Sequence, residues 1–570
     1  MAFPMINHRM LWGGFLLLSA LIISSLPFSE LVYRQGHDWI FELVRVSEYK
    51  FALLNGQIPP YWGENLYGGY GSPIFLYYPP LFSFVASLCS IVADSISVGS
   101  ITAIIIFSFV AVISMKLLLD EAVGGGSLGN EAASRMASYF FVLNPYLLGN
   151  KLIRNANAEY AALCLLPLAM YGLLLIRRSS KAGGLVLSSS FALVILAHNL
   201  TALIAAVLIL TLAVILYLPR RMRCSLATVF WSVCLGLGLS AFFWIPALFY
   251  TSLVRIEQLV QGQFDFHHQF QPIASFFQYE QFYSVGLLAP AAIIAAIGNL
   301  WIARYRTDER LQKLTILFLS GAFVFFFMQT RLSVFLWEKI PFMPLFAFPW
   351  RMMGPFALMT SILAGFALAS LFDGRSKLVI TSTEIIFLCL CIMNAVPHLR
   401  NNKPLPEQIA VQLSRMLDAE AIAQNGLSAT VLDEYLPKAA DPKIWRIPSR
   451  YIGPVVRSVP AIQIEILKNS GTEILLTTRS PSSARLSFAR WFFPVWECNV
   501  NSLPHRVEKS EVGAVDVSVP PGVNSIELNL KPLSARRITS WISLLSLAIW
   551  GGICVFQKGR RRASSHPSYY

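Results

Sequence analysis

The chain has 570 residues, of which 55% are hydrophobic types and only 13% are charged. Soluble domains carry about 25% charged residues, because their surfaces must be largely polar. The composition therefore excludes a soluble globular protein, and it excludes a disordered chain, whose apolar content would be low. The net charge of +14 would suit nucleic acid, but we expect no such partner, because the basic residues gather in short loops between apolar segments. The predicted class is an all-α polytopic membrane protein.

Thirteen apolar segments approach the length of about 20 residues that a helix needs to cross a hydrocarbon core. His8 and Arg9 precede the first segment and no small-residue cleavage site follows it, so we expect a retained anchor rather than a removed signal peptide. The segments are residues 11–27, 74–93, 97–119, 134–150, 160–176, 184–200, 201–218, 226–249, 282–303, 314–330, 345–371, 378–396 and 538–556.

Five clusters of Lys and Arg predict the orientation, because short cytoplasmic loops are enriched in these residues. Placing all five inside gives a consistent alternation from residue 160 onward, with both termini cytoplasmic and residues 397–537 outside. Arg536 and Arg537 fall on the outer side and are an exception. The clusters are Arg177-Arg178-Lys181, Arg220-Arg221-Arg223, Arg304-Arg306-Arg310-Lys313, Arg375-Lys377 and Lys558-Arg560-Arg561-Arg562.

The alternation requires an odd number of crossings between residue 30 and Arg177, yet four apolar segments lie there. We expect residues 74–93 not to cross, because Tyr77-Tyr78-Pro79-Pro80 interrupts them and proline removes a helical hydrogen bond. The alternative is 134–150, which Asn144-Pro145 breaks. Either choice predicts about twelve transmembrane helices and leaves residues 150–159 outside.

Three regions follow along the chain. Residues 1–396 form the transmembrane body, with a long first outer loop at 28–75 that is rich in aromatic residues, Gly and Pro. Residues 397–537 form an extracytoplasmic domain. Residues 538–570 form the last transmembrane helix and a basic cytoplasmic tail.

The extracytoplasmic domain is expected to begin with a helix at about 404–424 and to continue as strands. Apolar and polar residues alternate with a period of two at 462–466, 515–519 and 526–530, as in strands with one buried face. Pro520-Pro521-Gly522 predicts a turn between the last two. The pattern predicts a small C-terminal antiparallel β-sandwich.

Ionisable residues near membrane depth are costly and are usually functional. At the start of the first loop, after His37, residues Asp38, Glu42 and Arg45 have i, i+4, i+7 spacing and would share one face of a helix. That face places a carboxylate toward a cavity. The alternative is an ordinary side-chain ladder in which Arg45 neutralises Glu42.

Further candidates are predicted at the outer side of the membrane. A cation in the headgroup zone can bind phosphate through its planar fork, or it can simply extend toward water. For the polar residues at span ends, hydrogen bonds between helices are the alternative. These candidates are Arg154, Glu159, His198, Asn199, Arg331 and Arg351.

Several motifs together resemble a bacterial membrane family labelled "6-pyruvoyl-tetrahydropterin-synthase-related". The resemblance covers most of the chain. The motifs are His37-Asp38, Gly56, Pro60, Trp62, Gly69-Tyr70-Gly71, Phe75, Tyr78-Pro79-Pro80-Leu81, Arg154-Asn155-Ala156, Ala158-Glu159, His198-Asn199-Leu200-Thr201, Phe348-Pro349-Trp350-Arg351, Glu434-Tyr435-Leu436-Pro437-Lys438 and Trp491-Phe492-Phe493-Pro494-Val495-Trp496.

That family in turn resembles the GT-C superfamily of membrane glycosyltransferases, which take a sugar from a polyprenyl-phosphate donor. The resemblance implies that Asp38 is the general base, or orients the acceptor, and that Glu159 matches a second acidic residue that some members use with a metal. Members differ in metal use, so a divalent metal stays open. Arg154, Arg331 and Arg351 would stabilise the leaving phosphate.

The implied partners are membrane lipid, a lipid-linked sugar and a glycan or lipid acceptor. The implied location is the bacterial cytoplasmic membrane, with the chemistry on its outer face. Two alternatives stay open at this point. One is a transporter or flippase of lipid-linked glycans, and the other is a non-catalytic scaffold whose outer domain binds a glycan or a protein.

Overall fold

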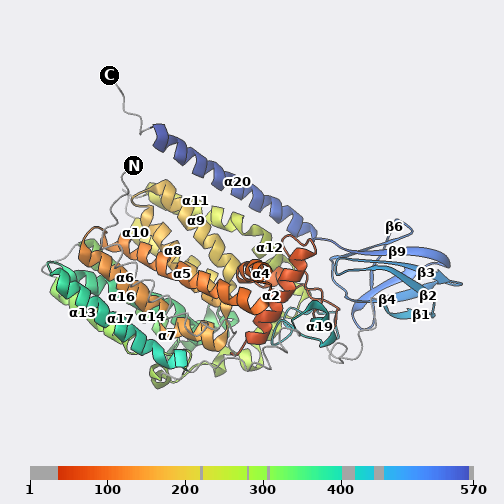
Figure 1. Ribbon diagram of the computed structural model, residues 1–570, viewed down its shortest axis with the longest axis horizontal. Coiled ribbons are helices and arrows are strands. Elements are labelled where there is room, and N and C mark those ends of the chain that lie inside the picture. Colours follow the sequence, from red (N-terminus) through yellow and green to blue (C-terminus); the bar gives the residue numbers. More distant parts are fainter. Residues whose placement is uncertain are drawn as a thin grey trace.

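The computed structural model describes residues 36–217, 223–278, 281–303, 309–400, 417–441 and 455–563 (Figure 1). The predicted first span at 11–27 lies outside these residues, as do most of the predicted helix at 404–424 and the arginines at 220 and 221. Helices make up the body, and strands gather at one end of the molecule.

The helices begin with α2, which follows Asp38, and end with α20, which leaves the β-sheets. Short 3-10 turns connect α12 to α13 and α14 to α16. The helical elements are α2 (Trp39–Leu54), α3 (Ile74–Tyr77), α4 (Leu81–Ala93), α5 (Ile96–Val123), α6 (Leu128–Val142), α7 (Pro145–Leu148), the π-helix η2 (Gly149–Arg154), α8 (Asn157–Leu175), α9 (Ser180–Ala197), α10 (Asn199–Tyr217), α11 (Arg223–Leu239), α12 (Ala241–Phe249), α13 (Leu288–Ala303), α14 (Glu309–Phe327), α15 (Val334–Lys339), η11 (Pro349–Met352), α16 (Met353–Phe372), α17 (Lys377–Arg400), α19 (Ala419–Gln424) and α20 (Ser534–Ala563).

Within the described ranges, eight helices are long and apolar enough to cross a membrane, or nine if α11 and α12, bent by 72°, form one broken span. The helices α4 and α13 are apolar but shorter. These findings agree with a polytopic α-helical body. The total of twelve crossings stays a prediction.

The segment 74–93 is broken where the prolines predicted it. Helix α3 ends at Tyr77 and Tyr78 is extended, so that α4 starts only at Leu81. The 13 residues of α4 span about 20 Å at 1.5 Å per residue, less than a hydrocarbon core of about 30 Å. This length favours the expectation that 74–93 does not cross.

The alternative segment, 134–150, is also interrupted. The side chain of Asn144 accepts a hydrogen bond from the Tyr146 N–H (3.0 Å) and Pro145 occupies the first position of α7, a standard helix start. The chain nevertheless continues through η2 to the start of α8.

At the opposite end of α5 and α8, Arg178 lies 3.9 Å from Glu121 and Arg310 donates to the Glu121 carbonyl. Two of the predicted inner basic clusters thus lie together.

A buried ion pair joins α6 to α17 inside the body. Nε and Nη2 of Arg135 donate to the two carboxylate oxygens of Glu384 at 2.7 and 2.9 Å, and the Tyr139 hydroxyl donates at 2.8 Å. Glu384 is 1% exposed. This fork-to-fork geometry fixes the register of the two helices, because neither charge has water as an alternative partner.

We expect Glu384→Ala to destabilise the protein by about 3–5 kcal/mol, because it leaves a buried arginine unpaired. The measurement is thermal unfolding of the purified protein in detergent. The double variant Arg135→Met/Glu384→Met is the control and should recover most of the loss. A single variant as stable as the wild type would contradict the ion pair's role.

The strands form two antiparallel sheets, which confirms the predicted C-terminal β-structure. The orders are β1-β4-β8-β7 and β2-β3-β9-β5-β6. Ile474, Ile526, Phe488 and Val517 are fully buried and come from both sheets. The turn at 520–522 passes from one sheet to the other. The strands are β1 (Val455–Val459), β2 (Gln463–Asn469), β3 (Glu473–Ser480), β4 (Ala484–Trp491), β5 (Trp496–Val500), β6 (Leu503–His505), β7 (Glu508–Lys509), β8 (Ala514–Val519) and β9 (Gly522–Leu530).

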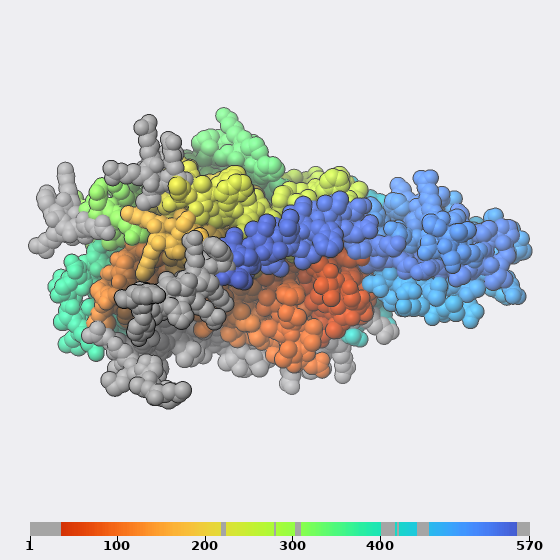
Figure 2. Space-filling model, turned by 90° about the horizontal axis from the view of Figure 1, so that it is seen from above, coloured from red at the N-terminus to blue at the C-terminus, as the bar shows by residue number. Residues whose placement is uncertain are grey.

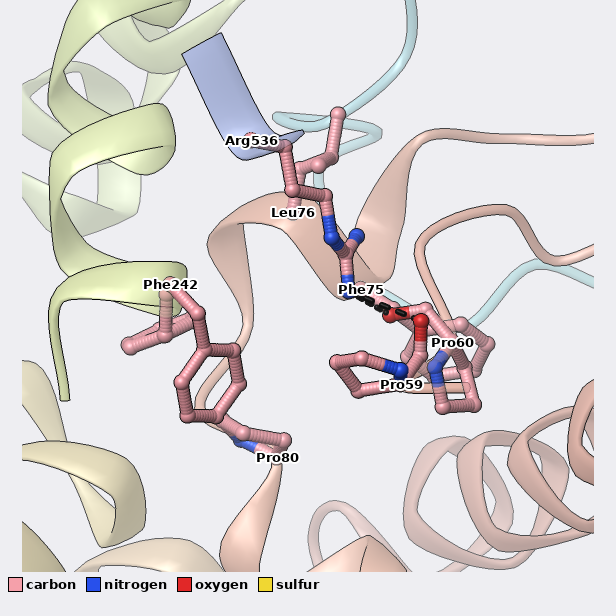
Figure 3. Close-up of a pocket in the computed structure, with 8 residues that line it drawn as sticks. Pro59, Pro60, Phe75, Leu76, Pro80, Phe242 and Arg536 are labelled. Atoms are coloured by element: carbon pink, nitrogen blue, oxygen red, sulfur yellow. Dashed lines mark hydrogen bonds between the residues drawn. The ribbon is translucent and has the colours of Figure 1, made fainter. Parts of the chain in front are cut away.

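Helix α20 lies lengthwise along the surface of the helical body (Figure 2). Its Ser543 hydroxyl accepts from the Phe242 N–H and donates to the Gly238 carbonyl at the bend between α11 and α12. At its start, Arg536 points into the first loop and donates to the carbonyls of Pro59 and Pro60 at 2.8 and 2.9 Å (Figure 3). Arg536, an exception to the orientation rule, therefore has a structural partner.

Candidate functional site

A cavity of about 930 Å³ lies where the first loop, η2, the α9–α10 junction, η11 and residues 430–435 meet. Arg331 does not line it. That side chain is exposed on a short 3-10 turn after α14. The hydrogen bonds of this turn are made with the end of α14, so the guanidinium stays at the surface. The other predicted site residues line the cavity: His37, Asp38, Glu42, Arg45, Arg154, Glu159, His198, Asn199 and Arg351.

The backbone fixes Asp38 against η2. The N–H groups of His37 and Asp38 donate to the carbonyls of Ile153 and Arg154, both at 2.9 Å. Gly36 permits this approach, because a Cβ there would lie 1.9 Å from the Asn155 side-chain oxygen. The Asp38 carboxylate is half-buried and has no hydrogen bond or ion pair to any described residue. Asp38 therefore lines the cavity without a polar partner among the described residues.

Glu159 is the centre of a buried ionic cluster. Nη1 of Arg154 donates to its Oε2 at 3.1 Å, and Nε of Arg351 lies 3.6 Å from the same oxygen. The Tyr146 hydroxyl donates to Oε1 at 2.6 Å, and Asn150 approaches that oxygen at 3.3 Å. Two guanidinium groups around one carboxylate leave a net charge of +1 beside the cavity.

Aromatic rings hold the two guanidinium groups in place. The Arg154 guanidinium lies 4.4 Å from the Trp350 ring centroid, and that of Arg351 lies 5.1 Å from the Phe348 ring. Nη1 of Arg351 also donates to the Phe346 carbonyl at 2.8 Å. Its Nε has no hydrogen-bond partner among the described residues. The cluster is thus preorganised and keeps donor capacity.

Glu42 and Arg45 form a second ionic pair, 2.5 Å apart, on α2. The Tyr78 hydroxyl donates to Glu42 at 3.0 Å, and the Arg45 guanidinium lies over the Tyr78 ring. Burial raises the pKa of Glu42 above its ordinary value, although the charge of Arg45 opposes this. The helix predicted at this position is present. Arg45 pairs with Glu42, as the alternative interpretation of the spacing predicted.

His198 and Asn199 lie at the junction of α9 and α10. Asn199 donates from its amide to the Tyr77 carbonyl at 3.2 Å, next to the break between α3 and α4. His198 Nδ1 lies 2.9 Å from the Thr201 hydroxyl. Both residues line the cavity. Asn199 makes a hydrogen bond to another helix, which was the alternative to a binding role, whereas the hydrogen bond of His198 is local.

Two cavity residues, Tyr78 and Glu434, were missed as site residues from the sequence, as was Tyr146, which contacts Glu159 without lining the cavity. Tyr146 precedes η2 by only a few residues, and Tyr78 lies in the helix break, so proximity to an interruption was a usable signal. Glu434 belongs to residues 417–441, which we name the strap. The strap crosses the first loop through hydrogen bonds from the Tyr67 N–H to Leu427 and from the Ser47 hydroxyl to Leu417.

The described residues do not fit a metal ion. Among them, no group of three or more His, Cys, Asp or Glu side chains could hold one. Glu159, which matched the second acidic position, has both oxygens engaged by Arg154, Tyr146 and Asn150. Its geometry is that of a residue that positions arginines.

The fold and the cavity define a class: a polytopic helical membrane protein with a charged cavity at the end that carries its β-sheets. Residues 75–401, more than half of the chain, match the 6-pyruvoyl-tetrahydropterin synthase related domain, a membrane-protein family. The chain belongs to this family, which confirms the resemblance seen in the sequence.

Solved structures similar to this one include the following three. The oligosaccharyltransferase of Archaeoglobus fulgidus has a TM-score of 0.44 at 14% identity, over 76% of this chain and 61% of its own. The arabinofuranosyltransferase AftD from Mycobacteria has 0.45 at 14%, over 74% and 27%. ArnT from Cupriavidus metallidurans, bound to undecaprenyl phosphate, has 0.37 at 12%, over 73% and 77%.

This chain therefore spans less than two thirds of the first two proteins. Similarity at these scores assigns neither an activity nor a substrate to it. A comparison with curated protein sequences finds no match.

Lys151 of η2 is buried beside the site. It is fully buried, its Nζ has no hydrogen-bond partner among the described residues, and it lies 5.5 Å from the Tyr160 ring centroid. Burial lowers the pKa of Lys151 to about 7. A short π-helix inserted into a helix is frequent at functional sites, and here it places Arg154 at the cavity, which Lys151 does not line.

Lys151 is expected to make stability depend on pH. Because its pKa is lower in the folded state than in the unfolded state, the unfolded chain binds more protons above pH 7, and stability should rise from pH 7 to pH 9. Lys151→Met should raise the melting temperature at pH 7 and remove most of that rise. Thermal unfolding in detergent measures both. Lys509→Met, at an exposed lysine, is the control, and equal pH profiles for the wild type and Lys151→Met would contradict the assignment.

Proposed function

We propose that the protein is a membrane glycosyltransferase that moves a sugar from a polyprenyl-phosphate donor to an extracytoplasmic glycan or lipid acceptor. The observation that carries the proposal is a cavity lined by both Asp38 and the net positive Glu159 cluster. The Asp38 carboxylate has no hydrogen bond or ion pair to a described residue. The family's resemblance to GT-C enzymes supports the same activity.

Arg154 and Arg351 are the proposed binding residues for the donor phosphate. As the sugar leaves, negative charge grows on the phosphate, and fixed cations in a partly dry site stabilise that charge more than water would. Glu159 is proposed as the positioning residue, because it holds both guanidinium groups and leaves one net positive charge for the phosphate. His37 and His198 also line the cavity.

Asp38 is the proposed general base. The acceptor hydroxyl oxygen bonds to the anomeric carbon, the bond from that carbon to the phosphate oxygen breaks, and Asp38 takes the hydroxyl proton. Such a reaction needs one base close to the acceptor rather than the two carboxylates of a glycosidase. Burial lowers the pKa of the adjacent His37, against the charge of Asp38, so the neighbouring ring is mostly neutral at pH 7.

An apolar wall suits the lipid part of the donor. Phe191, Leu203, Leu237, Trp244 and Leu248 come from α9 to α12 and line the same cavity. Several residues of α10, such as Val207 and Leu210, are exposed on the outside of the body, as a lipid-facing helix requires. A polyprenyl chain that entered along this wall would place its phosphate at the Glu159 cluster. The outer face of a bacterial cytoplasmic membrane is the proposed location.

Replacing Asp38 by Asn is expected to lower sugar transfer by about 100-fold or more, since general base catalysis contributes that much. The assay uses the purified protein in nanodiscs with a panel of radiolabelled undecaprenyl-phosphate sugars and a bacterial envelope fraction as acceptor. Asp94→Asn is the matched control, because Asp94 is an exposed acid after α4 in a left-handed conformation that Asn tolerates. Transfer by Asp38→Asn at the wild-type rate would remove Asp38 from the reaction.

Replacing Arg351 by Ala should weaken the binding of undecaprenyl phosphate by about tenfold or more, the value of a lost charge-assisted hydrogen bond. Arg351→Lys should lie between, because a point charge replaces the planar fork. Native mass spectrometry gives the affinities. Arg479→Ala, on an exposed strand residue, is the control. Unchanged affinity in Arg351→Ala would contradict the phosphate site.

A further inference from the structure

A second group of polar residues, Glu42, Arg45 and Glu434, lines the cavity, and the proposed chemistry does not use it. Oε2 of Glu42 and Oε2 of Glu434 are both buried without a hydrogen-bond partner among the described residues. Glu42 is only 2% exposed, and Glu434 is half-buried. Both residues line the same cavity as Asp38.

The strap brings Glu434 to this position. Nη1 of Arg45 donates to the Ala429 carbonyl, and the rings of Tyr435 and Tyr77 stack with centroids 5.6 Å apart and planes 3° from parallel. On its other side, the Lys438 N–H donates to the Leu253 carbonyl at 2.9 Å. These contacts attach the strap to α2, to the helix break and to the turn after α12, so Glu434 is held rather than carried on a loose loop.

When both carboxyl groups are ionised, the charge of this group is opposite to that of the Glu159 cluster. Glu42 and Glu434 accompany one cation, Arg45, which gives a net charge of −1, and Asp38 adds another negative charge beside them. A phosphate would be repelled here, whereas hydroxyl groups would be bound, because ionised carboxylates are pure hydrogen-bond acceptors. The ring faces of Tyr78 and Tyr435, which also line the cavity, would contact the apolar side of a sugar ring.

We propose that Glu434 and Glu42 form an acceptor subsite that binds the hydroxyl groups of an uncharged sugar. The inference rests on the proposed transferase function and deepens it, since it names the acceptor class and assigns two groups of cavity residues to two substrates. The donor phosphate binds at Arg154 and Arg351, the acceptor sugar binds at Glu42 and Glu434, and Asp38 lies next to the hydroxyl that reacts.

The electrostatics of the two carboxyl groups agree with this geometry. Burial raises the pKa of Glu434 and that of Glu42, in both cases against the opposing charge of Arg45. Burial disfavours the charged form of each group, although that form already accepts hydrogen bonds, and further donors would favour it. A bound sugar would supply them from its hydroxyl groups. The strap, which belongs to the outer segment, would thus take part in substrate binding rather than only cover the body.

The test uses the full-length protein in nanodiscs and a probe panel of the methyl glycosides of glucose, galactose, mannose and arabinose. Saturation-transfer NMR measures their binding. We expect the wild type to bind at least one, Glu434→Ala to weaken that binding by about tenfold, and Glu434→Gln, which keeps one acceptor oxygen, to lie between. Glu511→Ala, at an exposed acid in the turn between β7 and β8, should bind like the wild type.

A parallel titration with undecaprenyl phosphate distinguishes the proposed phosphate site from the proposed acceptor subsite. The affinity of Glu434→Ala for undecaprenyl phosphate should stay within about twofold of the wild-type value. Three results would overturn the proposal: no glycoside binds the wild type, Glu434→Ala binds as well as the wild type, or Glu434→Ala loses undecaprenyl phosphate instead. Binding of Mn²⁺ that Glu434→Ala abolishes would also overturn it, in favour of a cation. Failure of the proposed transferase function would appear in the sugar-transfer assay that compares Asp38→Asn with the wild type. That assay does not involve Glu434.

Discussion

The site depends on the burial of one carboxylate between two guanidinium groups. Glu159 is 4% exposed and Arg154 is 5% exposed, so neither charge could be removed from water without the other. Arg154 comes from η2, Glu159 from the start of α8 and Arg351 from η11, so that this single ionic contact joins elements far apart in the sequence. The excess positive charge that remains is the feature that a phosphate can use.

The rest of the cavity is arranged around that cluster. Backbone hydrogen bonds from the residues before α2 to η2 bring Asp38 close to it, and the break at Tyr78 supplies the partner of Glu42. The strap then adds Glu434 to the cavity lining. The net positive Glu159 cluster, Asp38 and a second pair of carboxyl groups line one cavity, and these groups are the physical basis for assigning two substrates and one base.

The sequence predicted much of this because ionisable residues near membrane depth are costly. Asp38, Arg154, Glu159 and Arg351 stood out for that reason, and proline placed the helix breaks correctly. Arg331 stood out for the same reason but lies on the surface, since the direction of a side chain in a short turn depends on local hydrogen bonds. Glu434 could not be assigned, because a contact such as that of Arg45 with Ala429 joins residues 384 positions apart and leaves no periodic signal.

The most direct test of the central claim is a cryo-EM structure of the protein in nanodiscs with undecaprenyl phosphate bound. The account predicts phosphate density within hydrogen-bonding distance, about 3 Å, of Arg351 and Arg154, inside the cavity and on the side that Asp38 faces. Phosphate density outside the cavity, or beside Glu42 and Glu434, would contradict the account.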